Sequence, residues 1–284
     1  MRIILLLLIL VQPWLVLGQE GVLLYVGSTE DSGWQIFELR LSSGAVSQLS
    51  FSMGDKREPQ HSAAAKLTTC RNSLGQVLKL NDGKEQVLIT NIQHCANYAL
   101  VPDGTAFYFT KPGEGIRRQD IWIQEITETE PRLAASVPEG MLKQVSVSAD
   151  GQWLTATHIW RANEERLVIF PTTNAGAPEY ATAEKSLDAF PHWAADSKSV
   201  LFSEQNARRN YELKQYSLEN KTVTTLLSSI RVNNCNPVTD KSGEFVFFER
   251  RSLEGSFIAC LDRKNGDVRK LPIPRQAREP FWYE

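Results

Sequence analysis

A pattern of about ten residues returns along the chain at a nearly constant interval. Each copy opens with small or polar residues, passes through an Asp-Gly-like turn and continues into alternating apolar residues. The copies are VPDGTAFYFT from Val101, SADGQWLTAT from Ser148, AADSKSVLFS from Ala194 and TDKSGEFVFF from Thr239. A repeat of this length is typical of propellers and other arrays, and it is rare in single-core enzymes.

A second apolar segment follows each turn at a fixed distance, and a short strand ending in Leu or Ile comes after it. The second segments are QIFELRL, QVLKL, DIWIQEI, RLVIF, YELKQYSL and SFIACL. Each unit therefore contains four short strands with period-two alternation, separated by turn residues. Long helical periodicity is absent from the sequence. Four-stranded units of about 45 residues predict an all-β chain built as propeller blades.

The number of blades follows from the two ends of the sequence. The segment REPFWYE (278–284) matches an inner strand that has no continuation, and GVLLYVGS (21–28) matches a second strand that has no first. Joined, they form one ordinary blade, and the pairing removes two bare strand edges. The copy at Ser62–Lys66 is degenerate, because SAAAK replaces the Asp-Gly turn. We expect residues 19–284 to form one monomeric, six-bladed β-propeller of four-stranded antiparallel blades. The C-terminal strand should pair with the N-terminal strands.

The repeat unit resembles the TolB-type, or WD40-like, propeller repeat. The matching residues are Pro191, Trp193, Asp196 and Phe202 in one blade, and Asp103, Gly104, Phe107, Phe109, Asp120, Ile121 and Trp122 in another. The resemblance extends from about Gly21 to Glu284. It implies a propeller without the α/β domain that precedes it in TolB and without the Gly-x-Ser-x-Gly elbow of propeller-bearing peptidases. In such families the ring usually serves as a platform for protein or ligand contacts, although a fold alone does not determine an activity.

The first eighteen residues predict a secretory signal peptide. Arg2 is followed by an apolar run to Val11, and small residues lie near Gly18. We expect cleavage after Gly18 and a periplasmic or secreted product. A membrane anchor is the alternative, but the uninterrupted apolar run is short for spanning a bilayer. No later segment resembles a transmembrane helix.

Export makes disulfides possible for the four cysteines. Four cysteines allow three pairings, and spacing alone does not choose among them. Cys70–Cys95 and Cys235–Cys260 are the first expectation, because each pair spans 25 residues. Buried free thiols are the alternative.

Arginine is concentrated in the segments that join the second strand of a unit to the third. In a propeller these segments share one face with the links that enter the inner strands. The planar guanidinium binds carboxylate or phosphate through two parallel hydrogen bonds, so the pattern predicts a face for an acidic envelope partner or an anionic ligand. The candidates are Arg71, Arg117, Arg118, Arg161, Arg208, Arg209, Arg250 and Arg251. Acidic residues are interleaved with them, and an Arg in this turn is also similar to the TolB-type repeat itself. Bracing of the loops is therefore the alternative.

The candidates for chemistry are weaker. His94, His158 and His192 are expected near one rim, where a metal-dependent lyase would need ligands, but none forms a His-x-x-x-His pair and no Cys lies at zinc spacing. No nucleotide-binding glycine loop occurs, so no cofactor is predicted. The net charge of −2 gives no argument for nucleic acid. We therefore expect an exported, non-catalytic binding scaffold. The alternative is an enzyme acting on carbohydrate or peptide at the mouth of the channel.

Overall fold

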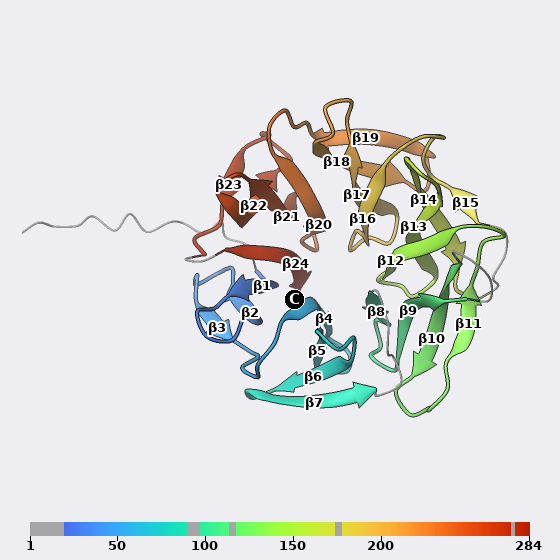
Figure 1. Ribbon diagram of the computed structural model, residues 1–284. Helices are drawn as coiled ribbons and strands as arrows, with labels where there is room; N and C mark the ends of the chain where they lie inside the picture. The colour runs from blue at the N-terminus through green and yellow to red at the C-terminus, as the bar shows by residue number, and fades with distance from the viewer. Residues whose placement is uncertain (1–19, 90–96, 114–117, 174–177, 274–275) are drawn as a thin grey trace, which may run out of the picture.

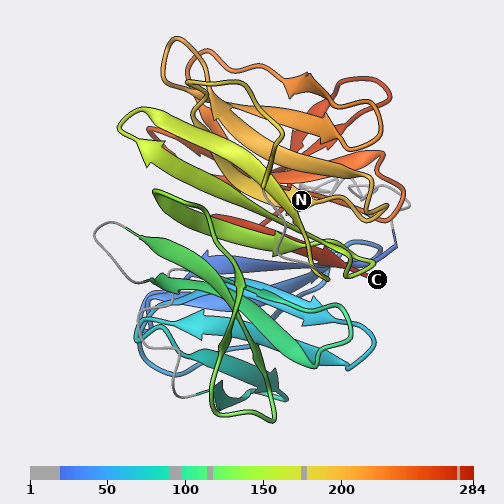
Figure 2. The ribbon, with the colours of Figure 1, turned by 90° about the vertical axis from the view of Figure 1, so that its right-hand side faces the viewer.

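The computed structural model describes residues 20–284 except 90–96, 114–117, 174–177 and 274–275. All regular structure in these residues is β, and the strands form six four-stranded blades around a central axis (Figure 1). Figure 2 shows the ring from the side of blades 3 and 4. Within the described ranges, no helix is long and apolar enough to cross a membrane. The six-bladed fold predicted from the repeat is confirmed.

The blades follow one another along the chain, and the strands of each blade lie in order from the channel outwards. Blade 1 contains β24 (Ala277–Tyr283), β1 (Val22–Ser28), β2 (Trp34–Arg40) and β3 (Val46–Gln48). Blade 2 contains β4 (Lys56–Ser62), β5 (Leu67–Asn72), β6 (Val77–Asn81) and β7 (Lys84–Ile89). Blade 3 contains β8 (Tyr98–Leu100), β9 (Ala106–Pro112), β10 (Gln119–Glu125) and β11 (Arg132–Ala135).

The second half of the ring has the same plan. Blade 4 contains β12 (Met141–Val147), β13 (Trp153–Arg161), β14 (Glu164–Pro171) and β15 (Glu179–Tyr180). Blade 5 contains β16 (Asp188–Trp193), β17 (Ser199–Gln205), β18 (Tyr211–Ser217) and β19 (Thr222–Leu227). Blade 6 contains β20 (Asn233–Thr239), β21 (Phe245–Ser252), β22 (Gly255–Asp262) and β23 (Val268–Lys270).

The ring closes within blade 1. Strand β24 pairs antiparallel with β1, and Leu24 lies opposite Phe281, as the two half-blades in the sequence predict. The remaining strands of each blade are consecutive antiparallel neighbours, so short turns suffice to join most of them. Blades 3 and 4 are also linked directly by one parallel bridge between Gln119 and Met141.

The core consists of separate apolar layers between neighbouring blades. One layer joins Leu23 and Tyr25 of blade 1 to Phe247 and Ile258 of blade 6, and equivalent layers lie between the other pairs of blades. Because side chains alternate across a strand, each blade contributes one set of side chains to the layer on each of its sides. Complete burial of one such side chain stabilises the fold by about 1.5–3 kcal/mol.

Most inner strands carry a β-bulge near the end at which the chain enters them. The bulged residue has a left-handed backbone with φ between 51° and 58° in the five blades where this position is described. These residues are Glu58, Gln144, Phe190, Asn236 and Glu279. Such a conformation costs about 1 kcal/mol or more for a residue other than glycine, so other interactions must offset it.

Hydrogen bonds between blades provide part of that compensation. The backbone N–H of Phe190 in blade 5 donates to Oε1 of Gln144 in blade 4 (2.8 Å). The N–H of Glu58 in blade 2 donates to Oε2 of Glu279 in blade 1 (2.8 Å). The bulge thus turns one side chain towards the equivalent amide of the next blade, which fixes the inner strands relative to one another.

The expected disulfide between Cys235 and Cys260 is wrong. Cys235 lies on β20 and Cys260 on β22, with β21 between them, so their Cα atoms are about two strand spacings (~10 Å) apart, beyond disulfide range. Cys70 has a buried free thiol rather than a bond to Cys95, which lies outside the described residues. Burial raises the pKa of both the Cys70 and Cys235 thiols to about 12, so neither is a reactive thiolate at neutral pH.

A buried carboxyl lies between blades 4 and 5. Oδ2 of Asp188 accepts hydrogen bonds from the Leu167 N–H (3.0 Å), the Ser186 hydroxyl (2.9 Å) and the Thr182 hydroxyl, while Oδ1 has no partner among the described residues. Burial raises the pKa of Asp188 to about 7, and the hydrogen bonds only partly oppose this rise. The fold therefore favours the protonated form of this carboxyl more than the unfolded chain does.

We expect the substitution Asp188→Asn to change how stability depends on pH. The raised pKa means that the folded protein binds more protons than the unfolded chain between about pH 4 and 7, so this group lowers stability as the pH rises through that range. Relative to D188N, the wild type should lose on the order of 2–4 kcal/mol between pH 4 and 8, measured by urea unfolding. The exposed-turn substitution Asp196→Asn is the control. Parallel pH curves for wild type and D188N would contradict the expectation.

Candidate functional site

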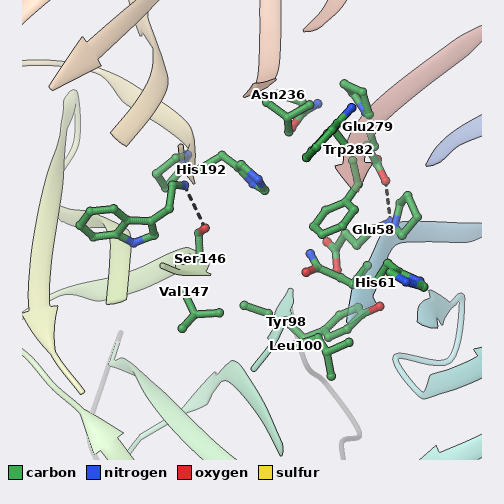
Figure 3. A pocket seen from close by; sticks show the side chains of 18 of the residues that line it. Glu58, His61, Tyr98, Leu100, Ser146, Val147, His192, Asn236, Glu279 and Trp282 are labelled. Carbon is green, nitrogen blue, oxygen red and sulfur yellow. Dashed lines mark hydrogen bonds between the residues drawn. The ribbon is translucent and has the colours of Figure 1, made fainter. Parts of the chain in front are cut away.

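A cavity of about 690 Å³ occupies the axis of the ring. The inner strands of all six blades line it, and His61, Tyr98, His192 and Trp282 surround it in Figure 3. It extends from the bulged residues to the turns that end the inner strands, so it is the central channel. We call the face with the bulges the link face, since it carries the links into the inner strands and the turns between second and third strands. The opposite face is the turn face.

Two arginines at the link-face mouth are paired with glutamates of the bulges. Arg71 donates from Nε (2.9 Å) and Nη2 (3.1 Å) to the two carboxylate oxygens of Glu58. Arg57 contacts Oε1 of Glu279 from Nη1 (3.4 Å), and 42% of its side chain remains exposed. The two glutamates are therefore engaged, whereas Arg57 keeps much of its guanidinium open to solvent.

A third arginine reaches the mouth from blade 6. Arg251 donates to Glu249 from Nε (2.5 Å) and Nη2 (3.1 Å), and Asn236 donates to the same carboxylate (2.8 Å). Glu249 is buried behind the channel wall, while 41% of the Arg251 side chain is exposed and lies over the Phe190 ring. The arrangement holds a cation at the wall of the channel with one amino group, Nη1, outside the ion pair.

Lys143 is the fourth cation of the mouth. It occupies the position just before a bulge, as Arg57 does in blade 2, and it has no ion-pair partner among the described residues. The cavity is thus lined by four cationic side chains and by two carboxylates, Glu58 and Glu279. Three of these cations are paired with Glu58, Glu279 and the buried Glu249, and Lys143 interacts electrostatically with Glu165, so the mouth is lined with cations but is close to neutral.

The deeper walls are aromatic and largely uncharged. His192 meets the Phe281 ring edge to face (5.8 Å between centroids), and His61 stacks on Tyr283 (3.8 Å). Burial lowers the pKa of His192 to about 4 and also lowers that of His61, so both rings are neutral at physiological pH. Burial raises the pKa of Glu58 to about 6, and the Arg71 guanidinium opposes that rise.

The arginines expected on one face divide into three groups. Arg71 and Arg251 line the cavity, whereas Arg118 is paired with Asp120 (3.0 Å) and Arg161 lies over the Trp160 ring (4.6 Å). Three others do not reach the channel: Arg250 donates to Asn234, and Arg208 and Arg209 are exposed on a turn. Arg117 lies outside the described residues.

Of the histidines considered for a metal site, the two that the structure describes lie on different strands and in different surroundings. His158 lies on the second strand of blade 4, where its Nε2 contacts the Glu139 carbonyl (2.7 Å) and its Nδ1 the Tyr180 hydroxyl (2.9 Å). His192 lines the channel, and His94 lies outside the described residues. Within the described ranges, no group of three or more His, Cys, Asp or Glu side chains is arranged to hold a metal.

Sequence reasoning missed Lys143 and the bulged residues. A signal for the bulges is present, because four of the five precede a proline: Glu58-Pro59, Phe190-Pro191, Asn236-Pro237 and Glu279-Pro280. The bulge of blade 4 lacks this dipeptide, because Gln144 is followed by Val145, so the signal does not locate Lys143. The dipeptide, rather than the loops, marks the mouth of the channel.

A closed ring of six blades around a lined axial cavity defines a TolB-like propeller domain. TolB from Acinetobacter baumannii is similar at a TM-score of 0.77 and 16% identity, covering 92% of this chain and 66% of that chain. A putative TolB from Agrobacterium tumefaciens is similar at 0.73 and 13%, covering 94% and 98%. A chain of a nidogen/laminin complex is similar at 0.71 and 10%, covering 92% and 98%. No family model and no curated protein sequence matches the chain. At these identities the likeness concerns the fold alone.

Proposed function

We propose that the protein is an exported, non-catalytic scaffold that binds an anionic group of a partner or ligand at the link-face mouth of its channel. The cationic side chains that line the mouth, and that keep N–H groups free to donate, carry the proposal. Arg57, Lys143 and Arg251 belong to blades 2, 4 and 6, so they approach the axis from three alternating directions. Carboxylates or phosphates entering the channel would meet them together.

The pairing of these cations favours recognition of a ligand over simple bracing. Lys143 has no ion-pair partner among the described residues, and Arg57 and Arg251 each keep about two fifths of the side chain exposed. An arginine that already contacts one carboxylate can still donate from its remaining N–H groups. A bound anion would therefore add contacts without breaking the existing pairs.

Rigidity favours binding at this place. The bulged strands are fixed to one another by hydrogen bonds such as Gln144 to Phe190 and Glu279 to Glu58. A ligand that enters a pre-ordered channel does not have to order its walls, which reduces the entropic cost of binding. The aromatic walls below the mouth offer apolar contact to the rest of the ligand.

The location is part of the proposal and rests on the sequence of residues 1–18. If they are a signal peptide, N-terminal sequencing of the protein from the periplasmic or culture fraction should begin at Gln19. An unprocessed chain that stays in the cytoplasm would contradict export. The binding site at the channel mouth would be unaffected by that result.

The enzymatic alternative has less support. It placed His94, His158 and His192 at one rim, but His158 is buried on a second strand with both ring nitrogens engaged, and only His192 of the described pair lines the channel. No observation on the described residues favours a particular reaction.

The test uses citrate, whose three carboxylates match Arg57, Lys143 and Arg251. We expect the double variant Arg57→Gln/Lys143→Gln to weaken citrate binding by about tenfold or more in calorimetry at low ionic strength. The control Lys198→Gln/Lys264→Gln removes the same charge from exposed turns of the turn face. Its affinity should stay within about twofold of the wild type. Equal affinity of both variants would refute binding at the mouth.

A further inference from the structure

Two loops of the link face meet outside the channel and display arginines together with bare apolar side chains. The first is the turn between β17 and β18 (206–210), and the second is the link between β19 and β20 (228–232). Arg208, Arg209 and Arg231 are exposed, and Ile230 is 65% exposed. In the register of β20 with β21, Asn233 lies opposite Arg251, so Arg231 and the fully exposed Leu253 extend from the same end of this pair. We call Arg208, Arg209, Ile230, Arg231 and Leu253 the outer patch.

The two loops are held as one unit by side-chain amides. Asn210 donates from Nδ2 to the carbonyls of Ile230 (2.9 Å) and Arg208 (3.4 Å). Asn206 donates from Nδ2 to the Ser229 carbonyl (2.7 Å) and to Glu212 (2.9 Å). The backbone of the two loops that carry the arginines and Ile230 is therefore ordered before a partner binds. Binding would not have to order these loops.

The arginines of the patch are not used within the fold. Arg208, Arg209 and Arg231 form no ion pair or side-chain hydrogen bond among the described residues, unlike Arg71 and Arg118 on the same face. Oε1 of nearby Glu212 accepts hydrogen bonds from Asn206 (2.9 Å) and from the Ser229 N–H (3.3 Å), and no arginine of the patch is paired with this carboxylate among the described residues. Arg209 also has a left-handed backbone (φ 61°), a conformation better suited to Gly or Asn. Loop bracing therefore does not explain these three side chains.

The chemistry of the patch points to an acidic protein segment rather than to a lipid surface. A flat anionic membrane laid against the link face would also meet the exposed carboxylates of Glu30, Asp31 and Glu254. A short segment can instead contact the outer patch alone. Guanidinium groups pair with carboxylates through two parallel hydrogen bonds, and Ile230 and Leu253 would bury apolar residues of the same segment.

We propose that the outer patch is a second contact surface, which binds an acidic segment of another protein that also carries apolar side chains. It lies outside the set of residues that line the channel. It would therefore operate whether or not the channel binds a ligand, and the two sites can be tested separately.

The probe is a fluorescent twelve-residue peptide of Asp and Glu that also contains two leucines. A second peptide, in which serine replaces both leucines, is the comparison. Binding of each peptide is measured by fluorescence anisotropy at about 50 mM salt. We expect Arg208→Glu/Arg209→Glu to weaken binding of the leucine peptide by about tenfold or more. Ile230→Ser should weaken it by about threefold and reduce the preference for leucine over serine. The control Lys198→Glu/Lys264→Glu, with the same charge change on the turn face, should alter affinity by less than about twofold. All variants change exposed side chains, so melting temperatures should stay near that of the wild type.

Three results would overturn the outer patch as a protein-binding surface. The first is unchanged affinity in R208E/R209E. The second is loss of peptide binding in Arg57→Gln/Lys143→Gln but not in R208E/R209E, which would place the peptide in the channel. The third is patch-dependent binding to phosphatidylglycerol vesicles without binding to the peptide, which would make the surface lipid-facing. If citrate binding fails at the mouth but peptide binding depends on Arg208 and Arg209, only the channel proposal falls.

Discussion

Deletion of residues 277–284 is expected to abolish cooperative unfolding of the ring. These residues include β24, the inner strand of blade 1, and without them β1 becomes a bare edge. The deletion also removes Ala277 from the layer between blades 6 and 1, and Glu279 from its contacts with Arg57 and Glu58. The loss of several buried contacts and of a whole strand ladder is large compared with the usual stability of a domain, which is about 5–15 kcal/mol. Calorimetry and size-exclusion chromatography should show no cooperative transition and a strong tendency to aggregate.

Two further variants make this expectation specific to closure. Removal of Glu284 alone should change the melting temperature little, because its ion pair with Lys241 is exposed. A circular permutant that joins Glu284 to Glu20 should fold, since Val22 and Tyr283 are already neighbours across the β1–β24 pair. Its new ends can lie in the exposed β18–β19 turn at 219–220. A deletion variant that still melts cooperatively close to the wild type would show that β24 is not needed for closure.

The substitution Glu85→Ala is expected to destabilise the protein by about 3–5 kcal/mol, because it leaves a buried cation without its counter-ion. The Lys56 side chain is 1% exposed, and its Nζ lies 3.6 Å from Glu85. The Glu85 carboxylate also accepts hydrogen bonds from the N–H groups of Phe51 (2.7 Å) and Ser52 (2.8 Å) and from the Ser52 hydroxyl (2.5 Å). The change thus removes an ion pair and three hydrogen bonds that hold the link from blade 1 to blade 2. Urea unfolding measures the loss.

Hydrogen exchange should show that the destabilisation caused by E85A is local to the link from blade 1 to blade 2. The amides of Phe51 and Ser52 should exchange faster in E85A, while those of the distant blades 4 and 5 should keep their protection until global unfolding. The control is Asp267→Ala, which breaks an exposed pair with Arg269 and should cost less than about 1 kcal/mol. If E85A costs no more than D267A, the buried pair does not stabilise the link.

The fold could be predicted from the sequence because each blade is a local meander. All the turn residues and alternating strands of one blade lie within about 45 consecutive residues. The repeat in the sequence therefore indicates the architecture directly. Closure of the ring could also be predicted, because REPFWYE and GVLLYVGS are each part of an incomplete blade and together complete one blade. The signal peptide and the monomeric state stay predictions.

The site was harder to predict from the sequence than the fold, because it depends on the direction in which each side chain points. Equal spacing suggested Cys235–Cys260, but spacing along the chain does not show that β21 lies between the two residues. Arg118 seemed available as a ligand-binding group, yet Asp120, two residues later, neutralises it. Lys143 lies outside the loops in which arginine is concentrated, because the mouth is built from the first residues of the inner strands.

The pairing of β1 with β24 also has a consequence for the order of assembly. Leu24 and Phe281 are separated by nearly the whole sequence, and contacts of such high contact order form slowly. A nascent chain can fold its middle blades early, but blade 1 stays incomplete until the last strand has been synthesised. The last tertiary step of the ring is therefore postponed until β24 is available, whereas the layers between the middle blades need no residue from either end.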